Sequence, residues 1–168
     1  MKNVRKMVLA SLFASLTAVC AWLAIPIPPV AVTMQTFAIL LALGTLGGKW
    51  GSVSILLYLG LGVVGLPVFA GFRGGASALL DPTGGFLWGF LLSALLYWLL
   101  ERLGKLPAMV AALAGCYFCG CLWFRVYSGG MDLGSVFLVC VAPYLIPDGL
   151  KLWLAHTLST RLRRHIPQ

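Results

Sequence analysis

The chain has 168 residues, of which 61% are hydrophobic and only 10% charged, and its mean hydropathy is +0.99. This composition excludes a water-soluble globular domain, in which about half of the residues are apolar and about a quarter are charged. In a soluble protein the net charge of +8 would suggest a nucleic-acid partner, but here the basic residues separate apolar runs instead of forming a stripe. We therefore expect a membrane protein with no nucleic-acid partner.

Proline, glycine and charged residues divide the apolar sequence into segments. No residue between Lys6 and Lys49 is charged, and the prolines in 25–29 interrupt this stretch because they cannot continue a helix. A glycine-rich turn at 47–51 and a Gly/Pro-rich segment at 67–85 separate the next runs. A hydrocarbon core about 30 Å thick requires roughly 20 residues per crossing. We therefore expect an all-α integral membrane protein, a single domain of residues 1–168, with six transmembrane helices at about 7–25, 34–47, 52–66, 86–100, 108–127 and 134–160.

Basic residues are unequally divided between the two sides that this topology defines. The poorer side has only Arg73 and Arg125, and Lys151 lies inside the last apolar run. Cytoplasmic loops are enriched in Lys and Arg, so we expect both termini in the cytoplasm. The richer side contains Lys2, Arg5, Lys6, Lys49, Arg102, Lys105, Arg161, Arg163 and Arg164.

The last apolar run contains two ionisable residues, Asp148 and Lys151. Each costs roughly 2.5–3.5 kcal/mol to insert into a bilayer, so such residues are expected to face a cavity or a partner. Their three-residue spacing places them on one face of a helix, where they can pair with each other and contact a polar ligand. Pro147 favours a helix start here, which would place Asp148 at the positive end of the helix dipole. A purely structural ion pair near the membrane surface is the alternative.

A second polar cluster is expected in the outer loop 67–75 and its continuation 81–86. Arg73 can bind a carboxylate through two hydrogen bonds, and the glycines allow the backbone to approach a ligand closely. A re-entrant turn without a ligand is the alternative. The apolar walls of this candidate site would be Phe69, Phe72 and Phe86.

Ala10, Ala14 and Ala18 follow one another at four-residue spacing in the first expected helix. Small residues at this spacing form a smooth strip that allows another helix to approach closely. The approaching helix can belong to the same chain or to a partner subunit, and the spacing does not distinguish the two.

Motifs for catalysis, metal binding and nucleotide binding are incomplete. Cys116 and Cys119 have the spacing of a metal or redox pair, but no second pair or nearby histidine completes a site. The segment 44–49 is one residue short of a phosphate loop, and Trp50 replaces the Ser or Thr that such a loop requires. We therefore expect no metal, no bound nucleotide and no enzymatic activity.

Four segments together resemble the biotin-specific S component of energy-coupling-factor (ECF) vitamin transporters: 65–71, 74–75, 82–86 and 147–151. The likeness extends over nearly the whole chain. It implies biotin capture at the bacterial cytoplasmic membrane by a multi-pass subunit without a cofactor. The implied partners are a transmembrane coupling subunit and two ATPase subunits, which alone use ATP. An autonomous small-molecule carrier, an S component for another vitamin and, more weakly, a membrane-embedded enzyme are the alternatives.

The resemblance also implies roles for single residues. It places Asp148 and Lys151 in the biotin pocket and directs the Ala10, Ala14, Ala18 strip toward the coupling subunit. We hypothesise that Asp148 accepts a hydrogen bond from a ureido N–H, while Lys151 and Arg73 bind the ureido carbonyl and the carboxylate in an order left open. Asp81 stands where family members often have Gly, and its role is open. The residues expected to pack against the biotin rings are Phe72, Phe86 or Tyr144.

Overall fold

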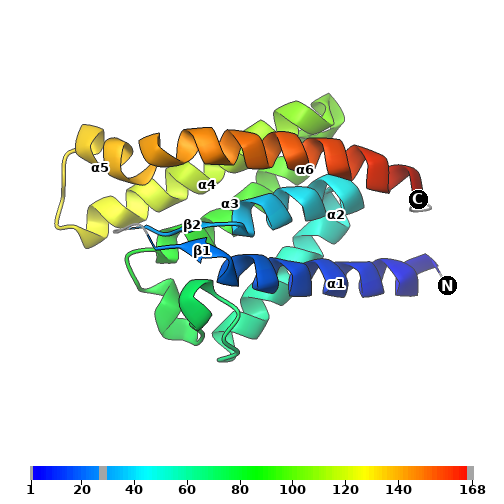
Figure 1. The fold of residues 1–168 in the computed structure, drawn as a ribbon, viewed down its shortest axis with the longest axis horizontal. Coiled ribbons are helices and arrows are strands. Elements are labelled where there is room, and N and C mark those ends of the chain that lie inside the picture. The colour runs from blue at the N-terminus through cyan, green and yellow to red at the C-terminus, as the bar shows by residue number, and fades with distance from the viewer. Residues whose placement is uncertain (1, 27–29, 166–168) are drawn as a thin grey trace.

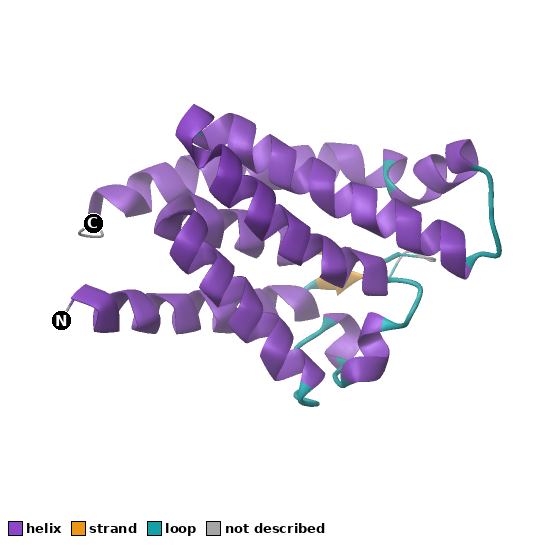
Figure 2. Ribbon diagram, turned by 180° about the vertical axis from the view of Figure 1, so that it is seen from behind, coloured by secondary structure: helices purple, strands orange, loops and turns teal. Residues whose placement is uncertain are grey.

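The computed structural model describes residues 2–26 and 30–165 as a bundle of helices joined by short irregular segments (Figure 1 and Figure 2). Residues 27–29 of the predicted proline interruption lie outside the described part. The helices are α1 (Lys2–Trp22), α2 (Gln35–Val63), α3 (Gly84–Leu100), α4 (Lys105–Tyr127), α5 (Leu133–Cys140) and α6 (Leu145–His165). The remaining elements are the strands β1 (Ala24–Ile25) and β2 (Val32–Thr33) and the 3-10 turns η1 (Ala70–Phe72), η2 (Ala76–Leu79), η3 (Glu101–Leu103) and η4 (Ala142–Tyr144).

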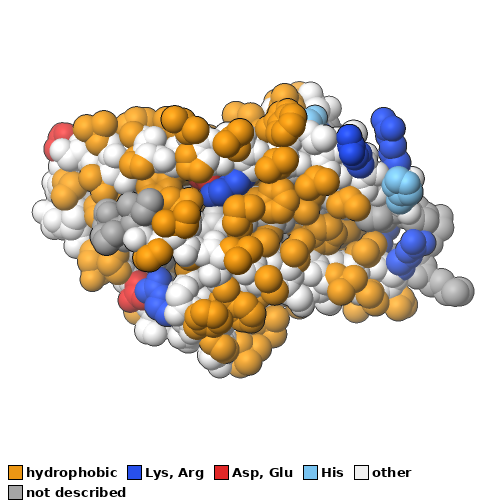
Figure 3. Space-filling model, viewed as in Figure 1, with side chains coloured by type: hydrophobic (Ala, Val, Ile, Leu, Met, Phe, Trp, Pro, Cys, Tyr) orange, Lys and Arg blue, Asp and Glu red, His pale blue; other side chains and the backbone are white. Residues whose placement is uncertain are grey.

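The described residues contain five helical segments that are long and apolar enough to span a membrane. Both termini lie at one end of the bundle, and basic side chains gather at that end while hydrophobic side chains cover most of the remaining visible face (Figure 1 and Figure 3). The prediction of an all-α membrane protein is confirmed. The five segments are Asn3–Trp22, Gln35–Val63, Gly84–Leu103, Lys105–Tyr127 and Leu133–His165.

Helix α2 is broken at Gly47, and the chain reverses direction there (Figure 1). Gly47 has φ 80° and ψ 173°, a conformation that is accessible to glycine but strained for residues with a Cβ. The N–H of Gly48, which begins the second limb of the helix, donates to Glu101 Oε2 at 2.7 Å. This bond satisfies one of the donors that a helix N-terminus leaves unpaired. The predicted helices 34–47 and 52–66 are therefore the two limbs of α2, and the second limb starts earlier than predicted.

The predicted helix over 134–160 lies within one candidate membrane-spanning segment, Leu133–His165, which is interrupted by a 3-10 turn. Helix α5 ends at Cys140, the 3-10 turn η4 follows, and α6 begins at Leu145. Pro143 lies in η4 and has no N–H to continue the helical hydrogen-bond pattern. Pro147 lies in the first turn of α6, where an N–H is not needed. The break places Asp148 in the first turn of α6, close to the helix start that Pro147 was predicted to favour.

Helices α3 and α4 pack closely because α3 presents small residues to α4. A Cβ atom built on Gly89 would lie 2.8 Å from the carbonyl oxygen of Cys116, which is too close for any larger residue without a shift of the backbone. Ser93, one turn further on, donates to the Ala112 carbonyl at 2.6 Å. This contact fixes the position of α4, which contributes two residues to the cavity described below.

The alanine strip of α1 is covered by the chain itself. Ala10, Ala14 and Ala18 are only 0%, 2% and 8% exposed, and α1 packs against α2. The strip is therefore buried within the chain in this structure, and its contact with a coupling subunit stays a prediction. Helix packing buries the face with the small side chains, and the exposed face of α1 carries Ser11 and Ser15 instead.

Candidate functional site

A cavity lies in the half of the bundle away from the termini, where β2 and the loop between α2 and α3 meet the helices (Figure 1). Segments that are far apart in the sequence contribute to it: β2, the start of α2, the loop between α2 and α3, the first part of α3, α4, η4 and α6. The apolar part of its lining includes Val30, Phe69, Ala78, Phe86, Leu87, Phe90 and Tyr144. The polar part consists of Thr33, Gln35, Thr36, Arg73, Thr83, Tyr117, Asp148 and Lys151.

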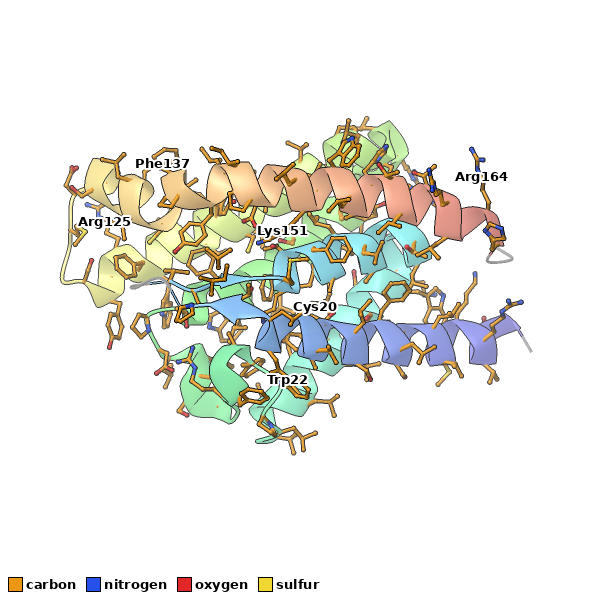
Figure 4. All side chains as sticks on the ribbon, viewed as in Figure 1. Cys20, Trp22, Arg125, Phe137, Lys151 and Arg164 are labelled. Atoms are coloured by element: carbon orange, nitrogen blue, oxygen red, sulfur yellow. The ribbon has the colours of Figure 1, made fainter. Side chains whose placement is uncertain are left out.

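Asp148 and Lys151 form a buried ion pair in the lining of this cavity. Lys151 Nζ lies 2.6 Å from Asp148 Oδ1, and their side chains are 8% and 5% exposed. Lys151 Nζ also donates to the Thr33 carbonyl at 2.7 Å. Figure 4 shows Lys151 directed from α6 into the interior, toward the start of α2. The predicted pairing on one helical face is confirmed, and both residues line the cavity.

Two further side chains hold the Asp148 carboxylate. Tyr117 OH donates to Oδ2 at 2.6 Å, and Thr36 Oγ1 donates to Oδ1 at 3.2 Å. Neither residue was predicted from the sequence, although a polar side chain within an apolar run was the available signal. A carboxylate has about four acceptor positions and an ammonium group three donors. Asp148 therefore retains one free acceptor position, on Oδ2, and Lys151 one free N–H, and both residues line the cavity.

The start of α2 is tied to the loop that follows α2. Gln35 Nε2 donates to Tyr58 OH at 2.5 Å, and Tyr58 OH donates to the Val68 carbonyl at 3.1 Å. Thr33 Oγ1 donates to Gln35 Oε1 at 3.0 Å. These bonds link β2, both limbs of α2 and the outer loop, so the polar wall is held rigidly against the loop.

Arg73 lies at the mouth of the cavity, in the segment between η1 and η2. Its Nη1 is 2.6 Å from Asp81 Oδ2, its Nη2 donates to Thr83 Oγ1 at 3.2 Å, and its Nε donates to the Ala70 carbonyl at 3.2 Å. The Arg73 and Asp81 side chains are 47% and 39% exposed, in contrast to the buried pair. Arg73 thus lines the cavity as predicted, but its charge is already paired within the chain.

Phe72, which was predicted to pack against the ligand, does not line the cavity. It is 64% exposed and stacks on Trp22, with ring centroids 5.1 Å apart. Gly71 and Phe72 both have positive φ, 71° and 58°, and this tight turn carries the Phe72 side chain outward. Phe69 is 2% exposed and lines the cavity, as do the predicted Phe86 and Tyr144. Phe90 on α3 completes the wall and was not predicted.

The geometry fits binding of a small amphipathic molecule. Aromatic side chains supply an apolar wall, one acceptor and one donor lie together in the buried part, and a basic group lies at the mouth. Within 2–26 and 30–165, no three His, Cys, Asp or Glu side chains are grouped so that they could hold a metal ion.

Comparisons with known proteins point to one family. The BioY family model matches residues 1–168. The chain is 36% identical over 165 residues to a protein of Thermotoga maritima described as biotin transporter BioY, covering 95% of this chain and 96% of the relative. It is 38% identical over 162 residues to biotin transporter BioY2 of Lactococcus lactis, covering 93% and 88%. A crystal structure of the S-component for biotin from an ECF-type ABC transporter superposes with a TM-score of 0.88 at 27% identity, covering 96% of this chain and 92% of that one.

Proposed function

The chain belongs to the BioY family, and from this membership we propose that it captures biotin as the substrate-specific subunit of an ECF-type transporter. It is a transport protein and not an enzyme. The relatives that share nearly its whole length are biotin transporters, and the superposed structure is a biotin S-component.

The observation that carries the proposal is the adjacent acceptor and donor of Asp148 and Lys151. The ureido group of biotin presents an N–H donor beside a carbonyl acceptor, so it is complementary to this pair. Asp148 accepts the ureido N–H, and Lys151 donates its free N–H to the ureido carbonyl. The position of Arg73 at the exposed end of the cavity supports the order in which Lys151 binds the ureido carbonyl and the carboxylate tail of biotin extends toward Arg73.

The apolar wall suits the ring system of biotin. Phe69 directly precedes η1, Phe86 lies in α3 and Tyr144 in η4, and all three border the same cavity as the ion pair. The thiophane ring and the methylene groups of the tail are apolar, and their burial against aromatic side chains contributes roughly 25 cal/mol per Å² of area removed from water. The ligand is biotin alone, and the pocket requires neither a metal nor another cofactor.

The chain crosses the membrane six times with both termini in the cytoplasm. Termini at one end of the bundle require an even number of crossings, and the reversal at Gly47 divides one of the five long segments into two. The end that holds the termini also carries most of the basic residues, as expected of a cytoplasmic side. The cavity then opens toward the opposite side, from which biotin is taken up across the bacterial cytoplasmic membrane.

The energy for uptake comes from partner subunits of an ECF module. The chain has no complete phosphate loop, and the superposed S-component belongs to an ABC-type assembly. The partners are a transmembrane coupling subunit and two ATPase subunits. Uptake therefore requires the complete module, whereas binding of biotin requires only this chain.

Calorimetric titration of the detergent-purified chain tests the proposal. Protein from a biotin-depleted host is titrated with biotin, and with thiamine and riboflavin as controls for other vitamins. We expect saturable binding of about one biotin per chain and no binding of the controls. A folded, ligand-free sample that binds none of them, or that prefers another vitamin, would contradict the biotin assignment. Proton-driven uptake by the chain alone in liposomes would support an autonomous carrier instead.

A further inference from the structure

The charges that surround the proposed biotin site cancel. Asp148 and Lys151 neutralise each other in the buried part, at 2.6 Å, and Arg73 and Asp81 neutralise each other at the mouth, also at 2.6 Å. Among the described residues, the charged side chains that line the cavity are Arg73, Asp148 and Lys151, and Asp81 pairs with Arg73 from just outside the lining. Because Asp81 pairs with Arg73, an anionic ligand that approaches Arg73 also meets a negative charge beside it.

Asp81 is held in place by its backbone. Its carbonyl oxygen accepts a hydrogen bond from Trp123 Nε1 at 2.9 Å and another from the Gly84 N–H at 2.8 Å, where α3 begins. Removing the acid from the mouth would break the anchor to α4 and the start of α3. The backbone of Asp81 is therefore fixed at a position from which its carboxylate can reach Arg73.

A ligand with a carboxylate tail and one with a neutral amide tail meet this mouth differently. The carboxylate can reach the two N–H donors that Arg73 has left, but it is repelled by Asp81. An amide tail can use the same donors through its carbonyl and can donate its own N–H toward Asp81, without charge repulsion. Because the side chains of Arg73 and Asp81 are partly exposed to solvent, a larger substituent on the amide nitrogen can extend out of the cavity there.

We infer that the pocket accepts biotin amides, biotin whose carboxylate is linked to an amine, as well as free biotin, and that Asp81 is the residue that determines this specificity. The inference rests on the proposed biotin site. It assigns Asp81 the function of reducing the pocket's preference for the free acid, because its carboxylate neutralises the positive charge of Arg73.

The test compares affinities for biotin and for its primary carboxamide, which has the same size, in the detergent-purified full chain. We expect the unaltered chain to bind the two within about threefold, a difference well below 1 kcal/mol. Asp81→Asn keeps the side-chain shape and should shift the preference toward the free acid by about tenfold. This factor corresponds to removal of a like charge about 6 Å away at an effective dielectric constant near 40.

Two further variants make the result specific. Arg73→Gln leaves Asp81 unpaired and should shift the preference by about tenfold in the opposite direction, toward the amide. Asp132→Asn is the matched control: Asp132 caps α5 through the N–H groups of Gly134 and Ser135, does not line the cavity, and Asn also caps helices well. It should leave the ratio of the two affinities unchanged.

The outcomes separate this inference from the biotin assignment itself. Biotin binding with more than about a hundredfold weaker binding of the amide by the unaltered chain would overturn the inference and leave the biotin site intact. An unchanged ratio in Asp81→Asn, or an equal shift in Asp132→Asn, would also overturn it. If a folded sample bound neither ligand, both the proposed function and the inference would fail.

Discussion

Asp148 and Lys151 offer a test that separates ligand binding from support of the fold. Asp148→Asn removes the negative charge and leaves the buried Lys151 ammonium group with neutral acceptors only, among them the Thr33 carbonyl. Removing one member of a buried ion pair typically costs about 3–5 kcal/mol of stability, because the remaining charge is uncompensated. Lys151→Met should cost a similar amount. The double variant Asp148→Asn/Lys151→Met has no unpaired charge, and most of the lost stability should return.

Biotin affinity should respond differently from stability. A hydrogen bond between a ureido N–H and a carboxylate is worth about 1.5–3 kcal/mol. Its loss in Asp148→Asn raises the dissociation constant by about 10- to 150-fold. The double variant lacks both the carboxylate and the ammonium group, so its affinity for biotin should not recover even though the fold does.

Thermal unfolding in detergent and calorimetric titration, each on the same four proteins, measure the two effects. The expected pattern is low melting temperatures for both single variants, a restored one for the double variant, and weak biotin binding by all three. Restoration of affinity together with stability in the double variant would refute the assignment. The pair would then be a structural element beside the binding site and not part of it.

Three further predictions follow from other parts of the cavity and the fold. Tyr117→Phe removes a 2.6 Å hydrogen bond to Asp148 and should raise the biotin dissociation constant about tenfold. The control Tyr127→Phe, at an exposed position outside the lining, should leave the dissociation constant unchanged. Equal titration curves for the two variants would contradict a role of Tyr117 in binding. Phe69→Ala should weaken biotin binding and cost about 3–5 kcal/mol of stability, because Phe69 is buried in the cavity wall. Phe72→Ala should leave the biotin affinity unchanged. Weaker biotin binding by Phe72→Ala than by Phe69→Ala would show that the loop is placed differently. Gly47→Ala should lower the melting temperature by an amount corresponding to about 1–3 kcal/mol, because φ 80° with ψ 173° is accessible essentially to glycine alone. The biotin affinity should stay intact. An unchanged melting temperature would argue against the reversal of the chain at Gly47.

Local sequence patterns predicted the features that depend on neighbouring residues alone. Hydropathy predicted a membrane protein because each apolar segment in lipid must satisfy its own backbone hydrogen bonds as a helix. This requirement can be read from each segment separately. Spacing predicted that Asp148 and Lys151 share a helical face, since three residues nearly complete a helical turn. The motifs around 65–86 and 147–151 indicated the family before any geometry was known.

The three-dimensional arrangement decided which candidate side chains meet. Thr36 and Tyr117 reach Asp148 from positions 112 and 31 residues away in the chain, and no local pattern encodes such distances. Phe69 faces the cavity and Phe72 faces outward because one turn with positive φ separates their directions. Composition made both equally suitable as pocket walls.

The burial of α1 and the pairing of Arg73 show the same division. An alanine strip specifies that a helix can approach closely, but which helix occupies that face depends on the packing of the whole bundle, and here α2 belongs to the same chain. Arg73 is a carboxylate-binding residue by its chemistry, yet only the folded loop brings Asp81 to its guanidinium. Local propensities and hydropathy thus determined what kind of protein this is. Long-range packing determined which residues form its site, because each contact there joins segments whose relative positions are set by the complete fold.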